Sequence, residues 1–218
     1  MRIAPEGWPF IGIAWLLVAA AAYLASRLGG GGLWWIGPSL LAIVAIWVVA
    51  FFRDPIRQGP RGDQYVLAAA EGHVVHVTEI DEPMFLKERA IRISIFLSVF
   101  DVHVNRYPVN GTVEMVRYNK GKFLHAAEEK ASLDNEQSSV GIRGPRGPVL
   151  VRQIAGLIAR RIVTDAKPGE RVSQSARLGL IRFGSRTDVF LPLSARPSIK
   201  VKPGDVVRVG GTVLAEYP

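Results

Sequence analysis

The chain has 218 residues, a formal net charge of +8 and 49% hydrophobic residues, which fits a membrane anchor followed by one domain of ordinary size. It contains no cysteine, so the composition excludes disulfide frameworks, cysteine-based zinc sites and thiol nucleophiles. The excess of positive charge favours an acidic partner. Because no nucleic-acid motif accompanies it, an anionic membrane surface is favoured over nucleic acid.

Two apolar runs, residues 8–25 and 33–52, open the chain. Each has about the length that spans a bilayer, roughly 20 residues, and neither carries an interior charge. They predict a transmembrane hairpin over residues 1–52, with an apolar hairpin buried in a soluble protein as the alternative. Three arginines follow the second run, Arg53, Arg57 and Arg61, against Arg27 alone in the connecting loop. The positive-inside rule therefore predicts an inner-membrane protein whose N-terminus and C-terminal part are cytoplasmic.

The remainder, residues 53–218, is predicted to form one catalytic domain of mostly β structure with few short helices, a sandwich or barrel. A linker rich in proline, glycine and charge covers residues 53–65. Helix is predicted only around residues 125–132, and a polar loop over 134–148. Apolar, β-branched segments predict strands at residues 66–70, 73–79, 90–100, 102–107, 111–118, 149–158, 178–183 and 187–193.

A short repeat supports the β prediction. The sequence KPGE at residues 167–170 recurs as KPGD at residues 202–205. Proline at the second and glycine at the third position are the signature of a type II turn. Such paired turns resemble those of biotinyl- and lipoyl-type β-sandwich barrels.

The stretch FLSVFDVHVNRYP, residues 96–108, contains a candidate acid–base group. In a strand, the period of two places Asp101, His103 and Asn105 on one face, where Asp101 can orient the imidazole. The alternative is an ordinary half-exposed strand with a solvated polar face. The same alternation places His73 and His76 on opposite faces, so no metal site is predicted.

Gly184 and Ser185 lie between the last two predicted strands. Glycine lacks a Cβ, so its carbonyl group can be approached closely and its backbone adopts unusual φ angles. Held in suitable geometry, the Ser185 hydroxyl can attack the Gly184 carbonyl and convert the peptide bond to an ester. The alternative is a simple turn, in which both residue types are common.

The segment RFGSRTDVFLP, residues 182–192, resembles the processing site of the pyruvoyl-dependent phosphatidylserine decarboxylases, in particular their short bacterial and archaeal subfamily. Residues 96–111 resemble a second family stretch, FLSPFDVHVNRxPVxG, with Val99 in place of proline. The likeness covers nearly all of residues 53–193. Arg106 stands where long-type members have a second histidine, and Glu71 replaces the aspartate of their Asp-Gly turn.

The resemblance implies self-cleavage between Gly184 and Ser185, giving a large chain 1–184 and a small chain 185–218 that stay associated. Ser185 becomes a pyruvoyl group, the cofactor, which forms a Schiff base with the substrate amine. Phosphatidylserine is then decarboxylated to phosphatidylethanolamine and carbon dioxide. His103 takes the position of the family's catalytic histidine. Glu71 and Asp101 compete as the carboxylate that assists it.

Two other interpretations stay open at this point. A pyruvoyl-dependent decarboxylase of a soluble amino acid would explain Ser185 but not the hydrophobic anchor. A non-enzymatic, membrane-anchored β module would need no cleavage at all. The sequence leaves the oligomeric state open, a homo-oligomer included.

Overall fold

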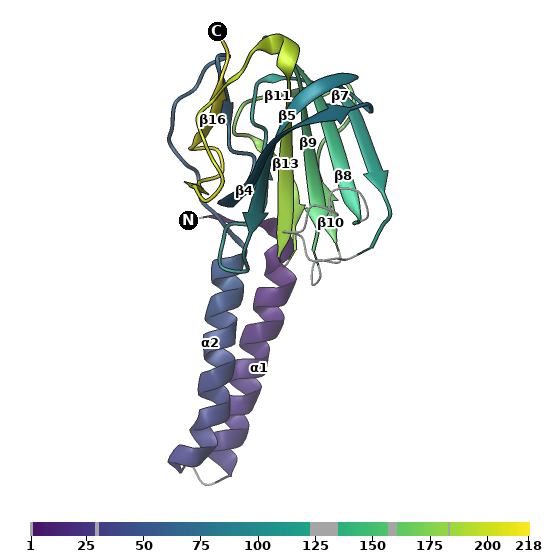
Figure 1. The fold of residues 1–218 in the computed structure, drawn as a ribbon. Coiled ribbons are helices and arrows are strands. Elements are labelled where there is room, and N and C mark those ends of the chain that lie inside the picture. Colours follow the sequence, from purple (N-terminus) through teal and green to yellow (C-terminus); the bar gives the residue numbers. More distant parts are fainter. Residues whose placement is uncertain (1, 29–30, 123–134, 157–160, 183) are drawn as a thin grey trace. The chain divides into compact units, whose positions relative to one another are not determined.

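The computed structural model of the protein describes residues 2–28, 31–122, 135–156, 161–182 and 184–218. It divides into two compact units, Met1–Pro55 and Ile56–Pro218. Figure 1 shows helices in the first unit and a set of β-sheets in the second. The predicted class, mostly β with an N-terminal pair of apolar helices, is confirmed.

The first unit is a helical hairpin. Short 3-10 turns, η1 (Pro5–Gly7) and η2 (Gly32–Trp35), precede α1 (Trp8–Arg27) and α2 (Ile36–Phe51). Both helices are long and apolar enough to cross a membrane, and only 6% and 11% of their apolar windows are buried. Their side chains therefore lack the protein cover that a soluble core helix has.

The two ends of this hairpin meet. Strand β1 (Arg2–Ile3) pairs antiparallel with β2 (Arg53–Asp54), which follows α2 directly. The segment before the first helix and the segment after the second therefore lie at the same end of the helix pair, as the predicted hairpin requires.

The described residues of the second unit form three antiparallel sheets and one 3-10 turn, η3 (Leu193–Ala195). The largest has eight strands in the order β11-β7-β8-β9-β13-β5-β4-β15, and the smaller sheets have the orders β10-β12-β6 and β14-β16-β3. The bounds are β3 Tyr65–Leu67, β4 Gly72–Glu82, β5 Glu88–Leu97, β6 Val104–Arg106, β7 Gly111–Asn119, β8 Gln137–Gly144, β9 Gly147–Ala155, β10 Ile162–Thr164, β11 Arg171–Val172, β12 Arg177–Ile181, β13 Ser185–Pro192, β14 Ser198–Ile199, β15 Val206–Val207 and β16 Val213–Glu216.

The main core is aliphatic and lies between the large sheet and the two small ones. Alternate residues of the central strands, such as Ile93, Val151 and Val189, are fully buried in it. The small sheets contribute Leu178 and Leu214 to the same cluster. The period-two alternation of apolar residues in the sequence thus marks one face of one curved sheet.

The repeated Lys-Pro-Gly-acid turns have the predicted type II geometry. The third residues, Gly169 and Gly204, have φ angles of 85° and 96°. In each turn the N–H of the fourth residue donates to the first carbonyl at 3.1 Å. Each turn introduces a two-residue edge strand, β11 or β15, so the repeat closes the two opposite edges of the eight-stranded sheet.

Three sequence predictions about local structure are wrong. Residues 137–148 are not a polar loop, because β8 and β9 form a tight hairpin there, with Gly144 opposite Gly147. A β-bulge between Val74 and His76 shifts the alternation, so His73 and His76 lie opposite Phe96 and Ser94, which share a face of β5. The third error, a turn at residues 98–101, is described with the site. The helix predicted at 125–132 lies outside the described residues.

Candidate active site

The Gly184–Ser185 peptide lies where the chain passes from one sheet to another. β12 belongs to a three-stranded sheet, whereas β13 is a central strand of the large sheet. Ser185 is the first residue of β13 and pairs with Leu97 on one side and Ala155 on the other. Gly184 precedes this ladder and has a φ of 62°, in the left-handed region that favours glycine.

His103 contacts Gly184, the residue before Ser185. Its Nε2 accepts a hydrogen bond from the Gly184 N–H at 3.4 Å, and its Nδ1 lies 3.0 Å from the Asp101 carbonyl oxygen. Because Nε2 is an acceptor and the carbonyl can only accept, the geometry assigns the proton to Nδ1. The side chain is fully buried. A neutral imidazole is therefore held against the backbone N–H of Gly184, the residue that precedes Ser185.

Asp101 meets His103 through its main chain. Residues 98–101 form a turn closed by the Asp101 N–H donating to the Ser98 carbonyl at 3.0 Å, so strand β6 begins only at Val104. The Asp101 carboxylate accepts the Ser98 N–H at 2.8 Å. The predicted strand face shared by Asp101, His103 and Asn105 is therefore wrong, because β6 contains only the last of these residues. The imidazole tautomer is fixed by a carbonyl oxygen, and a catalytic role of the Asp101 side chain stays a prediction.

The Ser185 hydroxyl is buried and unpaired. The residue has no exposed surface, and among the residues that the structure describes no group forms a hydrogen bond with its Oγ. A buried hydroxyl without a partner is rare because it loses its hydrogen bonds to water without replacement. Such a group is available for reaction with the neighbouring peptide.

Glu71 lies at the same end of the domain. The Leu67 N–H donates to the Pro108 carbonyl and the Arg106 N–H to the Ala69 carbonyl, both at 3.0 Å. The residue after Glu71, Gly72, begins β4 and lies against Leu97, the residue of β5 that pairs with Ser185. The Glu71 carboxylate forms an ion pair with Arg57 at 2.5 Å. The structure thus brings all five predicted site residues to one end, while the role of Glu71 stays a prediction.

A buried polar chain behind the site was missed by the sequence analysis. Asn105 donates to Thr187 Oγ1 at 3.3 Å and accepts from Gln153 Nε2 at 2.8 Å. Thr164 Oγ1 lies 2.9 Å from Gln153 Oε1 and 2.7 Å from Ser138 Oγ. The available signal was a glutamine and a threonine at core-facing positions of apolar strands.

The opposite face of β13 holds a different kind of polar group. Arg186 and Asp188, both fully buried, form a two-bond ion pair at 2.8 and 2.9 Å. Nearby, Arg152 lies 4.9 Å above the Phe190 ring, and burial lowers the pKa of its guanidinium. Because alternate residues of a strand point to opposite faces, this charged cluster is separated from Ser185 by the sheet itself.

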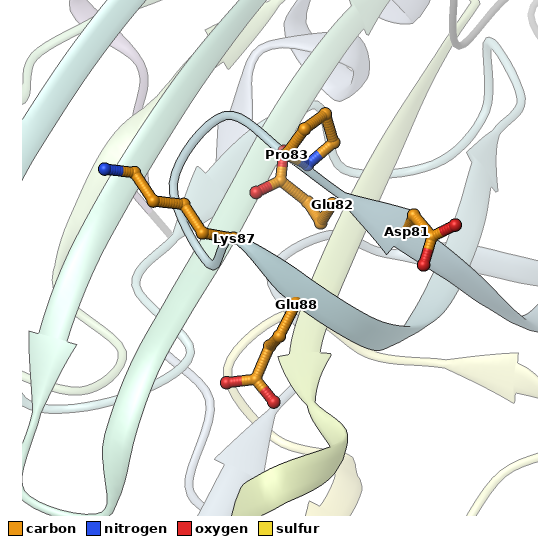
Figure 2. A pocket seen from close by; sticks show the side chains of 5 residues that line it. All are labelled: Asp81, Glu82, Pro83, Lys87 and Glu88. Atoms are coloured by element: carbon orange, nitrogen blue, oxygen red, sulfur yellow. The ribbon is translucent and has the colours of Figure 1, made fainter.

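A pocket at the tip of the β4–β5 hairpin does not form a second site. Figure 2 shows that Asp81, Lys87 and Glu88 point in different directions. Glu82 accepts hydrogen bonds from three successive backbone N–H groups of residues 84–86, and Glu88 accepts from Ser194. In the described part of the chain no three His, Asp or Glu side chains form a metal-binding group.

The chain was compared with known proteins. The family model described as phosphatidylserine decarboxylase matches residues 44–215. Three similar proteins are each named phosphatidylserine decarboxylase proenzyme. One from Symbiobacterium thermophilum is 46% identical and covers 99% of this chain and 96% of its own. Those from Ralstonia nicotianae and Cupriavidus taiwanensis are 45% identical, each covering 98% of this chain and 95% of its own.

The family match begins within α2, covers the β domain up to residue 215 and includes both motifs noted in the sequence, and the relatives extend over almost the full length. The Gly-Ser peptide and its histidine thus lie within the matched region. This chain belongs to the phosphatidylserine decarboxylase family.

Proposed function

We propose that the protein is the precursor of a pyruvoyl-dependent phosphatidylserine decarboxylase, which converts phosphatidylserine to phosphatidylethanolamine and carbon dioxide. One observation carries the proposal: a buried Ser185 hydroxyl, with no hydrogen-bond partner among the described residues, follows a left-handed glycine whose N–H is bonded to a neutral histidine. Family membership and the names of the relatives supply the substrate.

In the self-processing step, Ser185 Oγ attacks the Gly184 carbonyl carbon while His103 takes the hydroxyl proton. The C–N bond breaks, the Ser185 nitrogen is protonated, and an ester joins the two residues. Loss of the Ser185 Cα proton then expels the Gly184 carboxylate. Water replaces ammonia at the resulting dehydroalanine, which leaves a pyruvoyl group at the start of the small chain. Large chain 1–184 and small chain 185–218 remain paired through β13.

The residues present fit this group. β13 is hydrogen-bonded on both sides from its first residue, so a modified residue 185 would stay in place after cleavage. When formed, the pyruvoyl group supplies a ketone that takes up the substrate amine and accepts the electrons released with carbon dioxide. His103 is within reach of the site to hold and return a proton. Glu71 and Asp101 are the candidates that assist it.

The anchor suits a diacyl substrate. Two helices with the composition of membrane spans precede the domain, and a phospholipid resides in the bilayer that they would enter. We propose that the protein lies in the inner membrane with its β domain in the cytoplasm, because Arg53, Arg57 and Arg61 follow α2. Protease added outside sealed cells should then leave the β domain intact, and digestion from outside would reverse the orientation.

The direct test is the intact mass of the protein purified from its native host. We expect two chains, 1–184 and 185–218. The small chain should be blocked to Edman degradation and lighter by one ammonia than the same fragment produced by hydrolysis. A single full-length chain with unmodified Ser185 would contradict the proposal and favour a non-enzymatic membrane module. Cleavage with turnover of free serine but not of phosphatidylserine would favour a soluble amino-acid substrate.

A further inference from the structure

The buried polar chain behind the site connects strands that carry the two reacting groups. His103 lies two residues before Asn105, and Ser185 lies two residues before Thr187. Asn105 and Thr187 are hydrogen-bonded to each other at 3.3 Å, between β6 of the small sheet and β13 of the large one. This bond therefore ties the imidazole segment to the scissile peptide segment across the interface between the sheets.

The donor and acceptor of this hydrogen bond are defined by the other hydrogen bonds in the network. The Gln153 amide donates to Asn105 Oδ1, which leaves the Asn105 amide nitrogen to donate to Thr187. Thr164 has one hydroxyl proton, so it donates to Gln153 Oε1 and accepts from Ser138. Each side-chain amide orientation is thus set by its neighbour.

Burial of the network stabilises these side-chain orientations. Asn105, Gln153 and Thr187 have no exposed surface, and Ser138 is 1% exposed. Away from water, breaking one of these bonds leaves a polar group without a partner, so the members of such a network hold one another. A purely apolar interface would allow the sheets to slide, whereas directional bonds fix their relative position.

We propose that Asn105, Gln153 and Thr187 are positioning residues, which set the distance between His103 and the Gly184–Ser185 peptide for self-processing and afterwards between His103 and the modified residue 185. This inference rests on the proposed function and adds to it three residues that touch neither substrate nor the reacting atoms. Reactions of this kind depend on alignment, because a misplacement of about 1 Å can reduce a rate about a hundred-fold.

The test compares two buried glutamines. Gln174 is also buried and hydrogen-bonded, to the Tyr65 and Pro108 carbonyls, beyond the opposite end of β6 from His103. Gln153→Met and Gln174→Met remove the same amide at nearly constant volume. The full chain is synthesised in a cell-free system with phospholipid vesicles, and cleavage is followed by gel, stability by thermal unfolding, and turnover as carbon dioxide per cleaved chain.

We expect both variants to lose comparable thermal stability, but only Gln153→Met to slow cleavage, by about ten- to a hundred-fold. In the cleaved fraction kcat should fall while KM changes less than about twofold, because the network does not bind substrate. If the two variants cut and turn over alike, the network is structural and the inference is overturned.

A second pair keeps the test decisive if Gln153→Met fails to fold. Thr187→Val keeps the shape of the side chain but loses the hydroxyl, whereas Thr187→Ser keeps the hydroxyl. Slow cleavage in Thr187→Val, largely recovered in Thr187→Ser, supports the inference, and equal rates overturn it. A wild-type chain that remains whole would overturn the proposed function together with this inference, which distinguishes the two failures.

Discussion

β9 and β13 lie side by side at the centre of the large sheet, yet the chain enters them differently. β9 follows β8 through a tight hairpin in which Gly144 pairs with Gly147. β13 is reached from β12, which belongs to another sheet, and Gly184 precedes its ladder. The hairpin residues are held by local pairing, whereas the backbone N–H of Gly184 is held by His103, which precedes β6 of the small sheet. We therefore expect the cleavage reaction at the start of β13, where no hairpin partner fixes the backbone, and not at the start of β9.

The largest expected effect comes from removing the attacking hydroxyl. Ser185→Ala should remain a single chain without decarboxylase activity, because no other group at this position can form the ester. Gel analysis and a carbon dioxide assay measure both results. Ser94→Ala is the matched control: Ser94 is also fully buried with an Oγ that has no hydrogen bond among the described residues, but it lies within β5. Cleavage of Ser185→Ala would remove Ser185 from the mechanism.

The next largest effect concerns His103, which accepts a hydrogen bond from the Gly184 N–H. His103→Ala should reduce the rate by about a hundred-fold to ten-thousand-fold, as is typical when a positioned acid–base group is lost. An uncut variant would show that His103 serves processing, and a cleaved but slow variant would restrict it to decarboxylation. We expect both steps to suffer. His73→Ala, at an exposed position on β4, is the control, and normal cleavage with normal turnover in His103→Ala would exclude the imidazole.

A glycine pair tests the two strand entries directly. Gly184 and Gly147 both have positive φ, 62° and 128°, and an added Cβ would meet no atom closer than 3.8 Å at either position. Alanine therefore perturbs only the backbone, at a cost of about 1–2 kcal/mol in the left-handed region. We expect Gly147→Ala to lower the melting temperature but cut normally, and Gly184→Ala to cut slowly. Equal cleavage rates would contradict the distinction.

The smallest effect concerns stability in alkali, which should not depend on the site. Burial raises the pKa of Tyr217 to about 12, from 10.0. Between these values the unfolded chain loses a proton that the folded chain retains, so the free energy of unfolding falls as pH rises from about 10 to about 12. Tyr217→Phe should make this fall less steep and leave cleavage unchanged. Denaturant titrations at pH 9 and 11 measure the free energy of unfolding of both proteins. If Tyr217→Phe loses as much stability between these pH values as the wild type, the assignment is contradicted.

Much of the fold was accessible from the sequence because the relevant signals are local. The two apolar helices, the β-strands and the Lys-Pro-Gly-acid turns each depend on neighbouring residues, and the structure contains all of these elements. The errors occurred where the pairing of two strands, and not the residue pattern within one strand, decides the structure. The β8–β9 hairpin contains polar residues that read as a loop, and the bulge in β4 is decided by its register with β5.

The sequence by itself marked Gly184, Ser185 and His103, because glycine, a hydroxyl and an imidazole have distinct chemistry and lie in recognisable motifs. Only the tertiary structure decided how they meet. The pairing of β12 with β6 places His103 against Gly184, and the turn at residues 98–101 presents a carbonyl, not a carboxylate, to the imidazole. The links through Gln153 and Thr187 join residues 48 and 82 positions from Asn105. Local patterns cannot encode such contacts, since the packing of one sheet on another sets them.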